Sequence, residues 1–125
     1  MLFRSENKMA IPSGSGSEVL KRASIHGNSD AWTALITGVA NHIYTILSIT
    51  WAEEAGAAED IGLRVDISAA GSNQIAIMNN GTDLPAYGTY VWNDKFVITG
   101  TDKLEAYSSA GNVDIYCSYI DQDWT

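Results

Sequence analysis

The sequence predicts an all-β protein: a single β-sandwich, jelly-roll-like, with an extended N-terminal arm. Three observations lead to this prediction. Apolar and polar residues alternate along several short segments, which is typical of strands with one buried and one wet face. Clusters of Gly, Asn, Ser and Asp, which favour tight reversals of the chain, separate these segments. Outside residues 52–60, no stretch shows the 3.6-residue period of an amphipathic helix.

We expect an arm over residues 1–22 and one β-sandwich domain over residues 23–125, because 125 residues suit a single domain. Residues 11–17 read Ile-Pro-Ser-Gly-Ser-Gly-Ser, the composition of a flexible linker. Four cations face two carboxylates up to residue 22, whereas three cations face 13 carboxylates in the remainder. An arm of this kind orders only against a partner; the alternative is a frayed terminus without a function.

The strands are expected, in order, at residues 18–25, 30–39, 43–51, 61–68, 73–78, 87–92, 94–99, 103–108 and 113–120. The clearest alternation places Ile61, Leu63 and Val65 on one face. Residues 43–51 are apolar on both faces, which indicates a central strand or one covered by a neighbouring subunit. Between strands, Asn80-Gly81 favours a type I′ turn. Residues 52–60 are interpreted as an exposed acidic loop.

Composition excludes several classes of protein. A single cysteine cannot form an internal disulfide. No apolar run approaches the roughly 20 residues that cross a bilayer, so we expect no membrane partner. The start of the chain lacks the apolar region of a signal peptide, which indicates a cytoplasmic site of synthesis. Because the acidic body repels phosphate groups, we expect no nucleic acid partner.

Candidate catalytic and metal-binding residues are few. His26, His42 and Cys117 could hold zinc only if all three met, and Cys117 falls on the buried face of its strand. The carboxylates of residues 53–60 and 121–123 match no calcium-loop pattern. No nucleotide-binding, nucleophile-elbow or metalloprotease motif occurs. We therefore expect no catalytic residue, no metal and no cofactor, and predict that the protein is not an enzyme.

Aromatic residues are the remaining signal, with four tryptophans and six tyrosines in the chain. Tyr116 falls opposite the apolar face of its strand, beside Asp114 and Ser118. Tyrosine and tryptophan are enriched at protein interfaces, so we assign subunit contacts to Tyr44, Tyr116 and Trp124. The alternative is that exposed aromatic rings stack on sugars.

Several stretches carry a family resemblance. Residues 30–37 (DAWTALIT), 43–49 (IYTILSI), 90–98 (YVWNDKFVI) and 113–121 (VDIYCSYID) resemble small β-proteins of the structural modules of tailed bacteriophages. The resemblance extends from about residue 30 to the C-terminus and lies in strands and turns. Proteins of this kind include capsid decoration (cement) proteins, head fibres and tail-associated proteins. The resemblance implies no catalytic residue.

The resemblance implies a virion structural protein on the capsid exterior, assembled in the host cytoplasm. The favoured function is a decoration protein that binds the major capsid protein and sister subunits as a homotrimer. The arm would contact the capsid through a set of mainly apolar residues: Leu2, Phe3, Arg4, Met9 and Ile11. The alternative from another class is a tail-fibre or receptor-binding protein that recognises host surface glycans.

Overall fold

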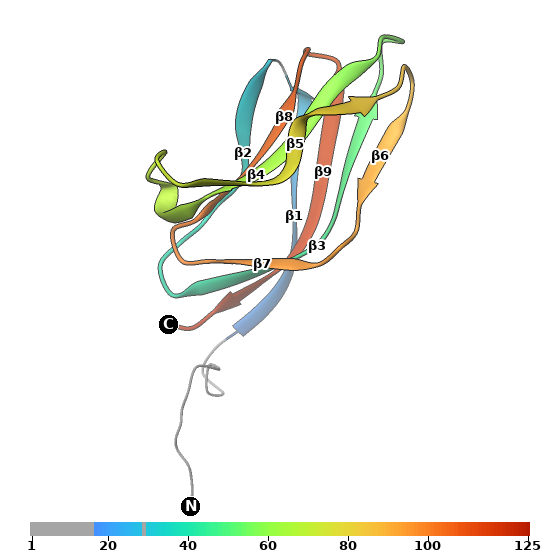
Figure 1. Ribbon diagram of the computed structural model, residues 1–125. Helices are drawn as coiled ribbons and strands as arrows, with labels where there is room; N and C mark the ends of the chain where they lie inside the picture. The colour runs from blue at the N-terminus through green and yellow to red at the C-terminus, as the bar shows by residue number, and fades with distance from the viewer. Residues whose placement is uncertain (1–16, 29) are drawn as a thin grey trace, which may run out of the picture.

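The computed structural model describes residues 17–28 and 30–125, and this part of the chain forms nine β-strands and one short 3₁₀ helix (Figure 1). The elements in chain order are β1 (Ser17–Asn28), β2 (Ala31–Thr37), β3 (His42–Glu53), β4 (Glu59–Asp66), η1 (Ile67–Ala69), β5 (Gln74–Leu84), β6 (Thr89–Trp92), β7 (Phe96–Thr99), β8 (Lys103–Ser108) and β9 (Val113–Asp123). Every predicted strand is present in the predicted order. In the described residues, no helix is long and apolar enough to span a membrane.

The strands form two antiparallel sheets that pack face to face (Figure 1). One sheet has the order β1-β9-β3-β6, with β7 also paired to β3, and the other has the order β2-β8-β4-β5. Strands β6 and β7 share the place next to β3, where each covers a different half of it. Counted as one position, they complete two four-stranded sheets in jelly-roll order. The predicted jelly-roll sandwich is confirmed.

The core lies between the sheets. It consists of the side chains that point inward from the strands, at about every second residue. The largest side chain within it is Trp51, which is fully buried and packs edge-on against Tyr90 with ring centroids 5.9 Å apart. Its other large, fully buried apolar members are Ile46, Ile49, Ile61, Leu63, Leu84, Ile98, Leu104, Val113, Ile115 and Cys117. Burying a Val, Leu or Ile side chain contributes about 1.5–3 kcal/mol, so this set is the main source of stability.

Strand β3 is apolar on both faces because it contains a bulge. Its register on β9 passes from Ile46 opposite Tyr119 to Ser48 opposite Ser118, so Leu47 is an extra residue. The bulge shifts the alternation by one, which lets both Ile46 and Ile49 point into the core. β3 is a central strand, paired to β9 on one side and to β6 and β7 on the other.

The predicted turn at Asn80-Gly81 is wrong, because both residues lie within β5. The register of β5 on β4 passes from Met78 opposite Leu63 to Thr82 opposite Ile61. Residues 79–81 therefore bulge opposite Gly62. A Cβ atom on Gly62 would lie 2.7 Å from the Asn80 Cα, so only glycine allows this close approach.

Two other boundaries differ from expectation. The structure begins β1 at Ser17, so residues 17–22 of the predicted arm pair with β9.

The loop after β3 is less exposed than predicted at its ends. Glu53 is only 4% exposed, and its carboxylate accepts hydrogen bonds from the backbone N–H of Ala55, Gly56 and Tyr87 at 2.7–2.8 Å. These bonds hold the pKa of Glu53 below its usual value, although desolvation acts in the opposite direction.

Candidate interaction surface

The outer face of the β1-β9-β3-β6 sheet is nearly free of charge. Residues directly opposite each other in an antiparallel pair share a face, and the register places Leu20 beside Ile120, Ser118 beside Ser48, and Thr50 beside Val91. The other members of the middle of this face are Arg22, Ser24, Thr45, Val97 and Tyr116. Arg22 is the one charged residue in this group. On a chain with a formal net charge of -8, this group has no carboxylate, and the centres of protein interfaces are likewise poor in charged residues.

Two grooves cross the outer face and meet at Tyr116, which is 44% exposed. The larger groove has a volume of about 550 Å³ and is lined by Leu20, Lys21, Arg22, Leu47, Ser48, Tyr116 and Ser118. The smaller one, about 360 Å³, is lined by Ser24, Ile25, His26, Thr50, Ala52, Asp114, Ile115 and Tyr116. Tyr116 stands between them as a ridge, so the prediction that its ring points outward is confirmed.

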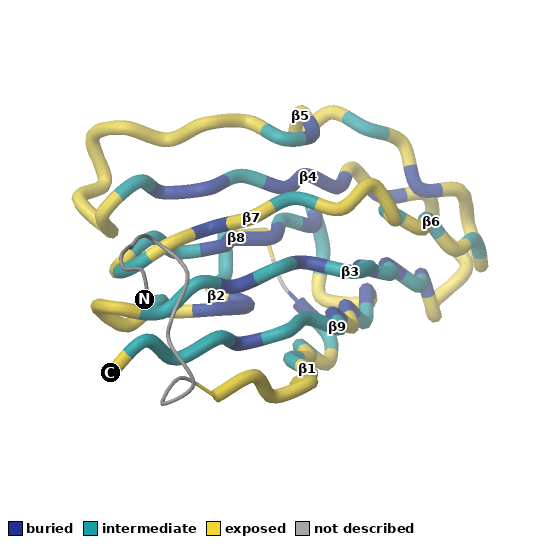
Figure 2. Tube along the Cα trace, turned by 90° about the horizontal axis from the view of Figure 1, so that it is seen from below, coloured by how far each residue is buried: buried dark blue, intermediate teal, exposed yellow. Residues whose placement is uncertain are grey.

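Strand β1 forms one border of this face. Among the described residues it pairs only with β9, so its other edge is free. Residues 17–22 are exposed, and Figure 2 shows this stretch as exposed along the edge of the sheet. Leu20 is 71% and Val19 is 47% exposed. A free strand edge with apolar side chains is a template for pairing with another chain.

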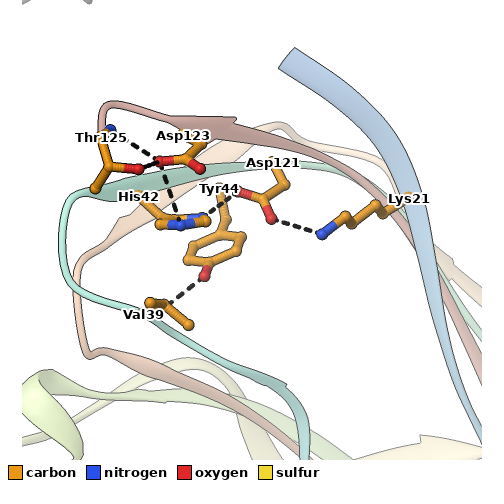
Figure 3. A network of polar contacts seen from close by, with 7 residues as sticks. All are labelled: Lys21, Val39, His42, Tyr44, Asp121, Asp123 and Thr125. Carbon is orange, nitrogen blue, oxygen red and sulfur yellow. Dashed lines mark hydrogen bonds and ion pairs between the residues drawn. The ribbon is translucent and has the colours of Figure 1, made fainter. Parts of the chain in front are cut away.

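A polar network fixes the beginning of β1 to the rest of the sheet (Figure 3). The Nζ of Lys21 donates to Oδ2 of Asp121 at 2.8 Å, and Nδ1 of His42 lies 2.7 Å from the other carboxylate oxygen. Burial raises the pKa of Asp121, but the bonds from Lys21 and His42 outweigh it and lower the pKa below its ordinary value. The network therefore fixes the N-terminal part of β1, around Lys21, to β9 and β3.

The predicted subunit contact at Tyr44 needs correction. Its ring is 3% exposed, stacks on His42 with centroids 5.8 Å apart, and its hydroxyl accepts a hydrogen bond from the Val39 backbone N–H at 3.0 Å. The bulge at Leu47 turns this part of β3 so that Tyr44 faces inward. Tyr44 therefore presents no surface to a neighbour.

Trp124 follows the end of β9 and is half-buried. Its backbone N–H donates to the carbonyl oxygen of Asn41 at 2.9 Å, while its indole Nε1 is buried without a partner in the described part of the chain. Of the three aromatic residues assigned to subunit contacts, only Tyr116 is exposed. The predicted arm contacts Leu2, Phe3, Arg4, Met9 and Ile11 lie outside the described residues.

The three residues considered for zinc do not meet. His26 lies 2.8 Å from Asp114 and His42 lies 2.7 Å from Asp121, and these carboxylates stand at opposite ends of β9. Cys117 lies between them but points into the core, where burial raises the pKa of its thiol to about 12. The two ring nitrogens of His42 both face carboxylates, since Nε2 lies 3.5 Å from Asp123. This is the geometry of a tether between strands.

Sequence reasoning missed one cluster. The structure brings His26, Glu54 and Asp114 together, with one possible ligand atom from each within 4.8 Å of the others. The neighbouring Asp114 carboxyl raises the pKa of Glu54. Desolvation raises the pKa of Asp114, but Glu54, the Gly27 backbone N–H and His26 together lower it below its ordinary value. His26 is 87% exposed in its side chain, so the cluster lies in open solvent. The residues come from β1, the loop after β3, and β9, and no sequence motif links them.

Comparisons with known proteins were made at the level of sequence and of structure. No protein-family model and no curated protein matches the chain. Two solved structures, each a pentameric capsid protein isolated from metagenomic phage sequences, are 13% and 11% identical, with TM-scores of 0.47 and 0.45. Each match covers 83% of this chain but only 61% and 62% of the capsid chains, so the chain spans about three fifths of their length.

A third solved structure, Eiger TNF from S. frugiperda, is 12% identical, with a TM-score of 0.38 over 85% of this chain and 92% of that one. With identities and TM-scores this low, none of the three matches assigns a function to the chain.

Proposed function

We propose that this chain is a bacteriophage virion structural protein that decorates and cements the capsid, binding the major capsid protein and sister subunits as a homotrimer on the outside of the head. The sequence resemblance to tailed-phage structural modules and the jelly-roll sandwich support this proposal. Two of the solved chains that it matches at a distance are phage capsid proteins, and the proposal places this chain in the same kind of particle.

The observation that carries the proposal is the nearly uncharged outer face around Tyr116, where Arg22 is the one charged residue of the middle group. The chain has 15 carboxylates, yet the residues that line the two grooves around Tyr116 include only one, Asp114, at the far end of the smaller groove. Such a face costs less to desolvate than a charged one, because an ionised group loses far more hydration than a hydroxyl or an aliphatic side chain. Tyr116 and Arg22 are the residue types most enriched at the centres of protein interfaces. We assign this face to the contact between sister subunits.

The free edge of β1 supplies a second mode of attachment. An extended segment of a neighbour can add to such an edge through backbone hydrogen bonds, and side-chain pockets then select the partner. Lys21 and Asp121 hold this strand in the sheet, so the edge is preformed. The proposal assigns it to a neighbour in the shell.

The arm is the proposed contact to the major capsid protein. Ordering each residue costs about 1–2 kcal/mol of backbone entropy. The apolar residues Leu2, Phe3, Met9 and Ile11 return about 1.5–3 kcal/mol each when fully buried, which is too little to order all residues before Ser17. We therefore expect that the arm is fixed only around these anchors or that it also pairs its backbone with the capsid protein.

The test compares the full chain with a chain that begins at Ser17, using purified heads of the phage that encodes it. We expect the shortened chain to keep its unfolding temperature, since the described sandwich is intact, and to lose co-sedimentation with heads. Undiminished co-sedimentation would contradict the assignment of the arm. A reconstruction of the particle separates head from tail, because density for the sandwich on the tail would contradict the decoration role.

A further inference from the structure

The opposite sheet has a groove of different chemistry, here called the Trp32 groove. It lies on the outer face of the β2-β8-β4-β5 sheet, has a volume of about 230 Å³, and is lined by Trp32, Arg64, Gln74, Ala76, Met78, Asn79 and Asn80. The proposed capsid role uses none of these residues. The groove combines an indole ring, a guanidinium group and three side-chain amides, so it offers many hydrogen-bonding groups beside an apolar wall.

Packing fixes the wall of the groove. Trp32 lies directly opposite Tyr107 on the neighbouring strand, with ring centroids 5.3 Å apart. The indole extends across Gly62, where a Cβ atom would lie 2.9 Å from its Cη2. The guanidinium of Arg64 covers the indole, with its Cζ 4.2 Å from the ring centroid. Glu105 orients that guanidinium by accepting from its Nε at 2.7 Å.

The bulge in β5 supplies the other wall. Residues 79–81 form the bulge opposite Gly62, and this places the amides of Asn79 and Asn80 at the rim of the groove. Gln74 of the same strand adds a third amide. Within the described part of the chain, no hydrogen bond engages these three amide side chains or the terminal nitrogens of Arg64. The groove thus presents donors and acceptors that are free to bind a ligand.

The charges of the groove indicate the class of ligand. Arg64 is the only charged lining residue, and its ion pair with Glu105 neutralises it. An anionic ligand would meet the Glu105 carboxylate, and a cationic one would meet the guanidinium. Amides and a guanidinium match ligands that carry several neighbouring hydroxyl groups. Because Arg64 covers the Trp32 indole, the apolar contact for the face of a sugar ring comes from Ala76 and Met78.

We infer that the Trp32 groove is a binding site for an uncharged saccharide, with space for about one sugar ring. The inference stands apart from the proposed capsid role, because the groove and the face around Tyr116 lie on different sheets. One chain can therefore attach to its particle through one sheet and present the other sheet to carbohydrate.

The test is a glycan array probed with the full chain, containing neutral glycans built from glucose, galactose, mannose and N-acetylglucosamine together with sialylated ones. We expect binding to neutral glycans, reduced at least tenfold in Asn80→Ala and in Gln74→Ala. The matched control Asn93→Ala removes an exposed amide between β6 and β7 and keeps binding. Tyr116→Ala, on the other sheet, also keeps binding.

Unfolding temperatures of all the variants show whether each remains folded. Exposed amides at positions 74 and 80 make no contact that folding needs, so both variants are expected to unfold as the natural chain does. Three results overturn the inference: no glycan bound, only sialylated glycans bound, or binding unchanged in both groove variants.

Discussion

Lys21 and Asp121 stand 100 residues apart in the chain and are joined by a hydrogen-bonded ion pair of 2.8 Å. Asp121 is 6% exposed, whereas nearly half of the Lys21 side chain is in solvent. A buried carboxylate needs such partners, because an unpaired buried charge is costly. The pair fixes β1 to β9 close to the start of the described chain.

The pair predicts a specific dependence of stability on acid. The pKa of Asp121 is lowered in the folded state, since the bonds from Lys21 and His42 outweigh its desolvation. Below pH of about 4 the unfolded chain binds a proton at this site that the folded chain does not, so the free energy of unfolding falls as the pH drops further. This contribution is fully present above that pH.

Asp121→Asn should weaken the fall of the free energy of unfolding in acid. It should also lower the free energy of unfolding at neutral pH by about 1–3 kcal/mol, because it removes a charged acceptor from a buried position. Urea unfolding between pH 2 and pH 7, chosen at about one-unit steps, measures both effects. The control is Asp94→Asn, at an exposed carboxylate. If the free energy of unfolding falls equally in acid for the natural chain and for Asp121→Asn, the pair does not govern stability in acid.

Gly62→Ala should destabilise the fold by about 1–3 kcal/mol, the range for overpacking a filled site. The added methyl group would lie 2.7 Å from the Asn80 Cα and 2.9 Å from the Trp32 ring, so the β5 backbone must move. Gly81→Ala is the matched control, because a Cβ there meets nothing within 4 Å. Thermal unfolding of the two variants gives the comparison. Equal unfolding temperatures would mean that the β5 backbone can move away from the added methyl group without a loss of stability.

Local signals were enough to predict the nine strands. Each strand alternates apolar and polar residues or is bounded by turn-forming ones, as at Ile61–Val65 and Gly100-Thr101-Asp102. The turn predicted at Asn80-Gly81 was wrong because the register of β5 depends on a contact between different strands. Only glycine at position 62 leaves room for both the Asn80 backbone and the Trp32 ring. Intrinsic turn propensity yields to such packing.

The candidate interaction surface could be predicted from the sequence only where alternation within one strand determines it. Tyr116 was placed outside by the alternation within its own strand, and this is confirmed. Its neighbours across the sheet were not found, since Leu20 and Arg22 reach it only through pairing between β1 and β9. Tyr44 was wrongly assigned to a subunit contact, because the bulge at Leu47, which turns Tyr44 inward, leaves no signature within β3.

Cys117 should react slowly with thiol reagents in the folded chain. It is fully buried, and burial raises the pKa of its thiol to about 12, so little thiolate exists at pH 8. Mass spectrometry after treatment with iodoacetamide should find the folded chain unmodified over a time in which the urea-unfolded chain is fully modified. Equal rates in the two states would show that β9 opens readily, which its central place between β1 and β3 does not predict.

The central claim is that the nearly uncharged face around Tyr116 joins sister subunits, and static light scattering tests it most directly. The full chain should have three times the 13.5 kDa mass of one chain. Tyr116→Arg places a second guanidinium beside Arg22 and should give the single-chain mass at an unchanged unfolding temperature. Tyr87→Arg, at a site that is 75% exposed and lines neither groove, should keep the trimer. A single-chain mass for the natural protein, or a trimer that persists in Tyr116→Arg, would contradict the claim.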